Sequence, residues 1–315
     1  MTIELARVEI KQKPWGSISL LPWSQASTDG EPIGELWFQR SDTTAPHTAL
    51  LLKLLFTTQP LSIQVHPDDA FARTIGLANG KTEAWYILSA GPDAQIALGL
   101  NRTLSPPELR SAIADGSIVD LVQWHPARTG DVVFVPAGTI HAIGAGIVLA
   151  EVQQRSDATF RLFDYGRQRE LHIDNAVVAA IAGPAPRQSA PMKFDESRKA
   201  VVVDAHFVLE QVEFPPGSIW TIDVQREAWL LAIAGSARIG SVKLAPGDAI
   251  FAEGDRADIE VGDHGLTILL AYVGPHVNPT ALKQRYDNTG HHSSLTPLIT
   301  TAPDIVLSKT TEAQT

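Results

Sequence analysis

The amino-acid sequence predicts a mainly β protein made of two β-barrel units with a small helical insert. Short apolar runs ended by Gly, Pro or Asp recur in both halves of the chain, for example LLKLLF, EAWYILS, DVVFVPAG and AWLLAIAG. Runs of this length between turn residues are typical of buried strands. Most connections are too short for crossover helices, which favours antiparallel sheets. The 315 residues also suffice for two domains.

Helices are expected only as inserts between strands. Ser105 can cap a helix, Pro106 suits the first helical position and Glu108 can complete a capping box. This pattern predicts a small helical insert near residues 102–123. A second short helix is expected over residues 174–182, just before a Gly-Pro-Ala-Pro break.

The break in the middle of the chain predicts the domain organisation. It opens a Pro-rich, charged stretch that separates the two β-rich halves. We therefore expect four segments, in this order: an N-terminal catalytic unit over 1–182, a linker over 183–197, a second, degenerate β-unit over 198–292, and a C-terminal segment over 293–315 that frays at its end.

An internal repeat supports the two units. EAWYIL at 83–88 resembles EAWLLA at 227–232, and each is followed later by Gly-Asp and an apolar strand, GDVVF and GDAIF. The copies differ in their histidines. His141 lies ten residues after Asp131, whereas the same step from Asp248 reaches Asp258, with no His beside it. We therefore expect the first unit to hold the chemistry and the second to be structural.

Composition narrows the classes of function. The net charge of −10 offers no basic surface for nucleic acid, so no nucleic-acid partner is expected. A phosphorylated ligand would need a local group of Lys and Arg side chains. The absence of cysteine excludes disulfides and thiolate metal ligands. No apolar stretch reaches the roughly 18 residues of a membrane span, and the first residues do not resemble a signal peptide, so we predict a cytoplasmic protein without a membrane partner.

Four side chains in the first half suggest a metal site. Gln64 and His66 alternate along the strand-like LSIQVHP and should share a face. Glu83 opens the strand EAWYIL, and His141 follows FVPAGTI. Three antiparallel strands of one barrel would bring these side chains together. Two imidazoles, a carboxylate and an amide oxygen suit a divalent ion such as zinc. Five other histidines are expected to be surface or hydrogen-bonded residues without a metal role: His47, His172, His206, His291 and His292.

Several longer segments resemble the type I mannose-6-phosphate isomerases, a zinc-dependent family built from two cupin, or jelly-roll-like, units. The resemblance covers roughly the first 175 residues. It runs through KPWGS, PIGELWF, LLKLLFTTQPLSIQVHPDD, NGKTEAWYIL and GDVVFVPAGTIHAIGAGIVLAEVQQRSDATFRLFDYGR. SIQVHPDD and EVQQRSDATFRLFDYGR are its specific parts. The chain is more compact than family members that carry a large helical domain.

The resemblance implies roles for particular residues. It assigns one divalent metal ion per chain, favouring Zn²⁺, to the same four ligands found above. It assigns the active-site arginine to Arg161 and substrate-facing positions to Lys81 and Glu151. Phosphate binding falls on Lys53 and Ser62. Among the catalytic candidates, Glu151 is the preferred proton-transfer group and Lys81 the second choice.

The function expected from these features is interconversion of mannose 6-phosphate and fructose 6-phosphate through an enediol. The expected partner is a small hexose 6-phosphate, and the oligomeric state stays open. Two alternatives remain. One is another metal-dependent cupin enzyme such as an iron oxygenase, although Gln64 stands where such sites usually have a histidine. The other is a non-catalytic sugar-phosphate binding protein.

Overall fold

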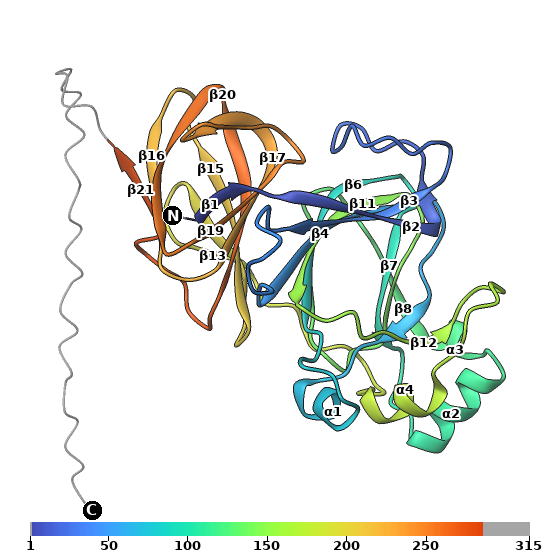
Figure 1. The fold of residues 1–315 in the computed structure, drawn as a ribbon. Helices are drawn as coiled ribbons and strands as arrows, with labels where there is room; N and C mark the ends of the chain where they lie inside the picture. Colours follow the sequence, from blue (N-terminus) through green and yellow to red (C-terminus); the bar gives the residue numbers. More distant parts are fainter. Residues whose placement is uncertain (1, 286–315) are drawn as a thin grey trace, which may run out of the picture. The chain divides into compact units, whose positions relative to one another are not determined.

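The computed structural model describes residues 2–285, and strands far outnumber helices in this part of the chain (Figure 1). All strand pairs are antiparallel, and the strands form three sheets. The prediction of a mainly β protein with a small helical part is confirmed. Two of the sheets belong to the first half of the chain, and the third belongs mostly to the second half.

The first half forms a sandwich. One sheet has six strands, in the order β2 (Arg7–Ser17), β3 (Ile33–Gln39), β4 (Leu50–Thr57), β11 (Ile147–Gln154), β6 (Glu83–Ala90) and β9 (Val132–Val135). The other has five, in the order β12 (Phe160–Phe163), β5 (Ile63–Val65), β10 (His141–Ile143), β7 (Gln95–Leu100) and β8 (Val122–Pro126). Trp85 and Leu149 from the first sheet pack with Ile96 and Ile143 from the second. The strands therefore form two facing sheets rather than the closed barrel expected, because apolar faces of both sheets share one core.

The helices gather at one end of this sandwich, as Figure 1 shows. They are α1 (Asp69–Thr74), α2 (Pro106–Ala114), α3 (Ile118–Leu121) and α4 (Ile173–Ala179). Leu109 and Ala176 pack with Ile63 and Leu162, so α2 and α4 cover the outer face of the five-stranded sheet. The backbone N–H of Ser105 donates to the Glu108 carboxylate over 2.7 Å. Both predicted helical regions are confirmed.

The second half folds as one ten-stranded sheet around its own core. Its members are β1 (Thr2–Leu5), β13 (Met192–Lys193), β14 (Arg198–Val203), β15 (Phe207–Phe214), β16 (Ile219–Val224), β17 (Ala228–Ile239), β18 (Val242–Leu244), β19 (Ala249–Glu253), β20 (Asp255–Val273) and β21 (Leu282–Arg285). The long strands β17 and β20 each pair with several neighbours. The first strand of the chain pairs with β19, so the N-terminal residues belong to this sheet.

The two halves share a core. Leu52 and Leu54 of β4 lie in one apolar cluster with Trp229, Phe251 and Leu269 of the ten-stranded sheet. The division into domains stays a prediction. The structure adds that the expected linker lies against β9, where the Gln188 side chain hydrogen-bonds the backbone of Phe134. Residues 286–292 of the expected second unit and the segment 293–315 lie outside the described residues.

The repeat adopts equivalent pairings in the two halves. EAWYIL forms β6 and pairs with β9, and EAWLLA leads into β17, which pairs with β19. Glu227, the counterpart of Glu83, accepts backbone N–H groups from Ala49 and Leu50 at 2.5 and 2.9 Å. Glu83 is a candidate metal ligand in the first copy, whereas its counterpart Glu227 holds the start of β4 by hydrogen bonds.

Candidate metal centre and substrate cavity

Three potential metal ligands converge between the two sheets of the first half. His66 directly follows β5, Glu83 begins β6 and His141 begins β10. One ligand atom from each lies within 4.8 Å of the others. The Nε2 atoms of His66 and His141 are 3.5 and 3.4 Å from the two Glu83 oxygens. The ligands come from both facing sheets rather than from three strands of one barrel. Within residues 2–285 no further group of this kind is found.

Both imidazoles are oriented by the backbone. The Nδ1 atom of His66 lies 2.7 Å from the carbonyl oxygen of Ala158, and that of His141 lies 2.9 Å from Thr139 O. A proton on each Nδ1 leaves the lone pair on each Nε2, as is usual for metal-binding histidines. In His66 this nitrogen lies 3.1 Å from the Lys81 Nζ. Burial lowers the pKa of His66 to about 4 and also lowers the pKa of His141. Both rings are therefore neutral near pH 7, the form that binds metal.

Gln64 lies in the same row of side chains. It is the cross-strand partner of His141 on β10 and of Arg161 on β12. Its Nε2 lies 3.3 Å from His141 Nε2, and its Oε1 accepts the Ser62 hydroxyl at 3.1 Å. Coordination through oxygen requires the amide to be turned over, which exchanges two groups of similar size. Gln64 is thus within reach of the cluster.

Glu83 supplies the strongest argument that these residues suit a cation. Both carboxylate oxygens are buried, and apart from the Lys81 ammonium no donor within the described part of the chain is hydrogen-bonded to them. Among the described residues, Lys81 is the ion-pair partner of this carboxylate, with its Nζ 2.9 Å from Oε2. A buried carboxylate needs charge compensation. Two neutral imidazoles, this carboxylate and a nearby amide form the donor set of a divalent ion at a catalytic site.

Charges around the cluster set its protonation. Burial alone would lower the pKa of Lys81, but the carboxylates of Glu83 and Glu151 outweigh burial and raise it. Burial alone would raise the pKa of Glu83, but the Lys81 ammonium holds that pKa well below its usual range. Lys81 is therefore a charged hydrogen-bond donor and Glu83 an anion. This state argues against Lys81 as a proton-accepting base.

A cavity of about 190 Å³ adjoins the cluster. It is lined by Lys13, Trp15, Glu35, Lys53, Leu55, Leu61, Ser62, Gln64, Lys81, Ile143, Glu151, Asp157, Thr159, Arg161, Arg169 and His172. Five of these are Lys or Arg and three are Asp or Glu, which leaves two positive charges in excess while His172 is neutral. The cavity is locally cationic although the whole chain carries −10. The cavity includes Ser62 and every substrate-facing residue suggested by the family resemblance.

Lys53 occupies a special position in this cavity. It lies opposite Glu151 in the pairing of β4 with β11, and its Nζ is 2.9 Å from a Glu151 oxygen. Glu35 Oε2 lies 3.9 Å from the same ammonium and accepts the Trp37 indole N–H at 2.6 Å. Lys53, predicted to hold phosphate, is thus already engaged by two carboxylates.

Arg161 projects from β12 and keeps donors available. Its Nε is buried without a hydrogen-bond partner among the described residues. Its backbone N–H donates to the ring Nδ1 of His172 at 3.1 Å. Its backbone carbonyl accepts the backbone N–H of His172 at 2.9 Å. Burial and the neighbouring Arg169 lower the pKa of Arg161. An arginine with a free, buried donor beside a cavity is suited to bind an anionic oxygen.

Some residues that line the cavity had no role predicted from the sequence. Glu35 and Lys13 lie in PIGELWF and KPWGS, segments that carry the resemblance but received no role. His172 was expected to be uninvolved, yet it lines the cavity. Membership of a matched segment was the available signal for Glu35 and Lys13. Nothing in the residues around His172 distinguished it from a surface histidine.

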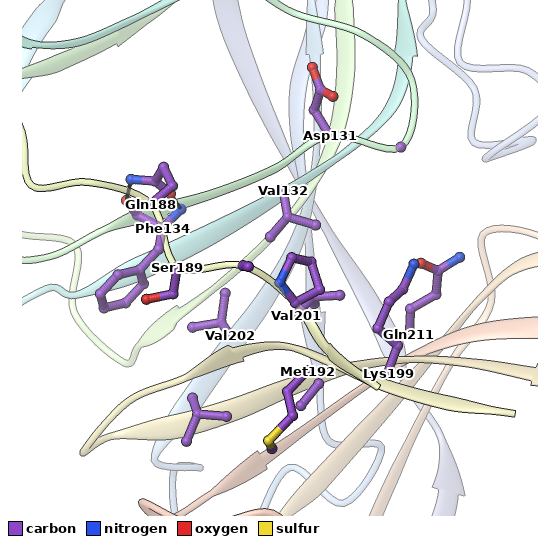
Figure 2. Close-up of a pocket in the computed structure, with 15 residues that line it drawn as sticks. Asp131, Val132, Phe134, Gln188, Ser189, Met192, Lys199, Val201, Val202 and Gln211 are labelled. Atoms are coloured by element: carbon purple, nitrogen blue, oxygen red, sulfur yellow. Dashed lines mark hydrogen bonds between the residues drawn. The ribbon is translucent and has the colours of Figure 1, made fainter. Parts of the chain in front are cut away.

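A larger cavity lies elsewhere and contains none of the expected site residues. It measures about 610 Å³ and lies between β9, the expected linker and β14. Figure 2 shows Val132, Phe134, Val201 and Met192 around it. No cluster of metal-ligating side chains adjoins it in the described part of the chain. The smaller, polar cavity is therefore the candidate active site.

No helix within residues 2–285 has the length and apolar character to cross a membrane.

Comparison with known proteins gives sequence relatives that share one name. No family model matches the chain. The mannose-6-phosphate isomerase of Streptococcus mutans is 38% identical over 189 residues, which is 56% of this chain and 60% of that protein. The mannose-6-phosphate isomerase ManA of Bacillus subtilis is 43% identical over 159 residues, 47% of this chain and 50% of that protein. The matched regions thus span less than two thirds of these relatives.

Solved structures extend the likeness over most of the chain. The mannose 6-phosphate isomerase from Bacillus subtilis superposes with a TM-score of 0.75 at 26% identity, covering 88% of this chain and 100% of that one. The apo enzyme from Salmonella typhimurium gives 0.68 at 16% identity, covering 87% and 100%, and shows a shared fold alone. Sequence and structure together confirm the resemblance of this chain to the type I mannose-6-phosphate isomerases.

Proposed function

We propose that the protein is a metal-dependent isomerase that interconverts mannose 6-phosphate and fructose 6-phosphate. One observation carries the proposal: a buried His–Glu–His cluster adjoins a cationic cavity lined by Lys81, Glu151 and Arg161. The relatives that carry this name support the choice of reaction.

We assign one divalent ion per chain to Gln64, His66, Glu83 and His141, with Zn²⁺ favoured by the mixed nitrogen and oxygen donors. Bound there, the ion would act as a Lewis acid on a sugar oxygen. The local geometry supports these four residues, because both imidazoles present Nε2 toward Glu83 and Gln64 adjoins His141.

The remaining side chains would handle the proton and the developing charge. Isomerisation of the open-chain aldose to the ketose moves one proton from C2 to C1 and one from O2 to O1, through an enediol. Glu151 is our choice for this transfer: it would accept the proton from C2 of the aldose and return it to C1. Arg161 stays protonated and would stabilise negative charge on the sugar oxygen. Lys81, held as an ammonium, would donate a hydrogen bond to a substrate oxygen.

Phosphate recognition by Lys53 and Ser62 stays a prediction. The ion pair with Glu151 competes with any phosphate for the Lys53 ammonium. The excess of cationic side chains in the cavity supports an anionic substrate in general. A phosphorylated hexose also accords with the cytoplasmic location that we predict.

A coupled assay tests the proposal. Purified protein supplied with Zn²⁺ is mixed with mannose 6-phosphate, and fructose 6-phosphate is followed with and without a chelator. We expect turnover that the chelator abolishes and added Zn²⁺ restores. Binding of mannose 6-phosphate without turnover in metal-replete protein would point to a binding protein. Oxygen consumption after reconstitution with iron would point to an oxygenase.

A further inference from the structure

We infer that Asp69 and Gln154 are positioning residues. They hold the backbone of the segment that carries Lys81 and Glu83 in place. Neither residue lines the cavity. The inference deepens the proposed function and depends on it only through the identity of the metal ligands.

All three backbone N–H groups from Gly80 to Thr82 donate hydrogen bonds. Gly80 N–H donates to Asp69 Oδ1 at 2.8 Å, and Lys81 N–H donates to the carbonyl of Pro67 at 2.9 Å. Thr82 N–H donates to Gln154 Oε1 at 2.9 Å. Two of these three acceptors, on Pro67 and Asp69, lie one and three residues after His66. The segment that presents Lys81 and Glu83 is therefore tied to the segment that presents His66.

Gln154 joins the same network from β11. Its backbone N–H donates to Thr82 O at 3.1 Å, and its Nε2 donates to Asp69 Oδ1 at 3.0 Å. The residue is 7% exposed, so water does not readily replace these bonds. Its side chain continues the pairing of β11 with β6 beyond Glu83, the first residue of β6. Oδ1 of Asp69 thus receives two donors and links three segments.

Close packing leaves this arrangement little freedom. A Cβ atom added at Gly80 would lie 2.6 Å from Pro67 O and 2.5 Å from the carbonyl carbon of Asp68. The two turns therefore touch through their backbones. Because Glu83 follows directly, loss of the Asp69 and Gln154 bonds would release the backbone that aims its carboxylate. Residues that orient metal ligands typically change metal affinity about 10- to 100-fold when removed.

A residue of the second β-unit, His206, lies near Oδ2, the other oxygen of the Asp69 carboxylate. His206 Nε2 lies 3.6 Å from Asp69 Oδ2, and Asp204 Oδ1 lies 2.6 Å from His206 Nδ1. The two oxygens of Asp69 therefore face different neighbours. Asp69→Asn can keep an oxygen toward Gly80 and Gln154 while it places an amide toward His206. The Asp69→Asn variant therefore separates the hydrogen bonds to Gly80 and Gln154 from the contact with His206.

The test compares Asp69→Ala, Asp69→Asn and Gln154→Ala with Asp68→Ala. Asp68 is the matched control, because its carboxylate accepts Phe71 N–H as the cap of α1 and makes no bond to residues 80–82. Zn²⁺ affinity is measured by competition with a chromophoric chelator, and hydrogen–deuterium exchange follows the amides of 80–82. Circular dichroism identifies the variants that are folded.

We expect Asp69→Ala and Gln154→Ala to weaken Zn²⁺ binding about 10- to 100-fold and to speed exchange at 80–82. Asp69→Asn should restore most of the affinity. Equal behaviour of Asp69→Ala and Asp68→Ala would overturn the inference, as would unchanged affinity in folded Gln154→Ala. Neither measurement needs turnover, so weakened Zn²⁺ binding in a protein that does not isomerise mannose 6-phosphate would reject the proposed function alone.

Discussion

Lys53 on β4 and Glu151 on β11 lie directly opposite each other, and the Lys53 ammonium is 2.9 Å from a Glu151 oxygen. Both side chains are 4% exposed. The pair joins two central strands of the six-stranded sheet at the wall of the cavity. It places the preferred proton-transfer group beside an ammonium group.

Removal of Lys53 should destabilise the fold. Lys53→Met leaves the Glu151 carboxylate buried without its ion partner, and we expect a loss of about 3–5 kcal/mol in the free energy of unfolding. Denaturant unfolding of the metal-free protein measures it. The double variant Lys53→Met, Glu151→Gln should recover part of the loss, because no buried charge remains unpaired. A double variant whose loss of unfolding free energy equals the sum of the losses of Lys53→Met and Glu151→Gln would contradict the coupling.

Glu35 should contribute to the pH dependence of stability. Burial alone would raise its pKa, but Lys53, Lys13 and the Trp37 indole outweigh burial and lower it. The folded pKa thus lies below the unfolded one, so the stabilisation is complete above the unfolded pKa and is lost as pH falls through the folded pKa. We expect the stability difference between the wild type and Glu35→Gln to shrink on acidification from pH 7 to pH 3. A constant difference would exclude this linkage.

The two histidines of the cluster should be needed for metal. His66→Ala and His141→Ala each remove one ligand atom, and we expect their zinc content after dialysis to fall well below one ion per chain. Elemental analysis checks this. His47→Ala is the control, because His47 is exposed and outside the cluster. Full zinc retention by both cluster variants would reject the ligand set.

Arg161 should act on turnover rather than on metal. Its guanidinium lines the cavity, and we expect Arg161→Ala to lower kcat about 10²- to 10³-fold, the range for loss of one donor to a developing oxyanion. Zinc content should stay normal. Arg102→Ala, a change at an exposed residue beside α2, should leave kcat unchanged. Near-normal turnover of Arg161→Ala with normal zinc would remove Arg161 from the mechanism.

The second unit has a buried ion pair that should affect stability alone. Arg198 donates two bonds of 2.8 Å to the Glu210 carboxylate, and both side chains are fully buried. Burial and Glu210 raise the pKa of Tyr272, whose hydroxyl donates to the same carboxylate. We expect Arg198→Met to cost about 3–5 kcal/mol of unfolding free energy, measured with denaturant, and to leave zinc content unchanged. Loss of zinc in a folded variant would show that the second unit controls the metal site.

Local patterns were enough to predict much of the fold. The apolar runs between turn residues became strands, and Ser105-Pro106 began a helix, because strand period and helix capping depend on neighbours in the chain. The failure of the repeat at Asp258 also predicted that the second unit would lack a counterpart of His141. Asp258 indeed lies exposed on β20, and the cluster of potential ligands within residues 2–285 lies in the first half.

Sequence alone therefore determined the β-rich class, the helical insert and the four candidate ligands, which lie in short recognisable segments. Tertiary structure decided that the strands form facing sheets, that Glu83 meets His66 and His141 from the opposite sheet, and that Lys53 pairs with Glu151. It also brought Glu35 and His172 to the cavity. The physical reason is that alternation along a strand sets which side chains share a face, whereas sheet pairing and packing over long sequence distances set what that face meets.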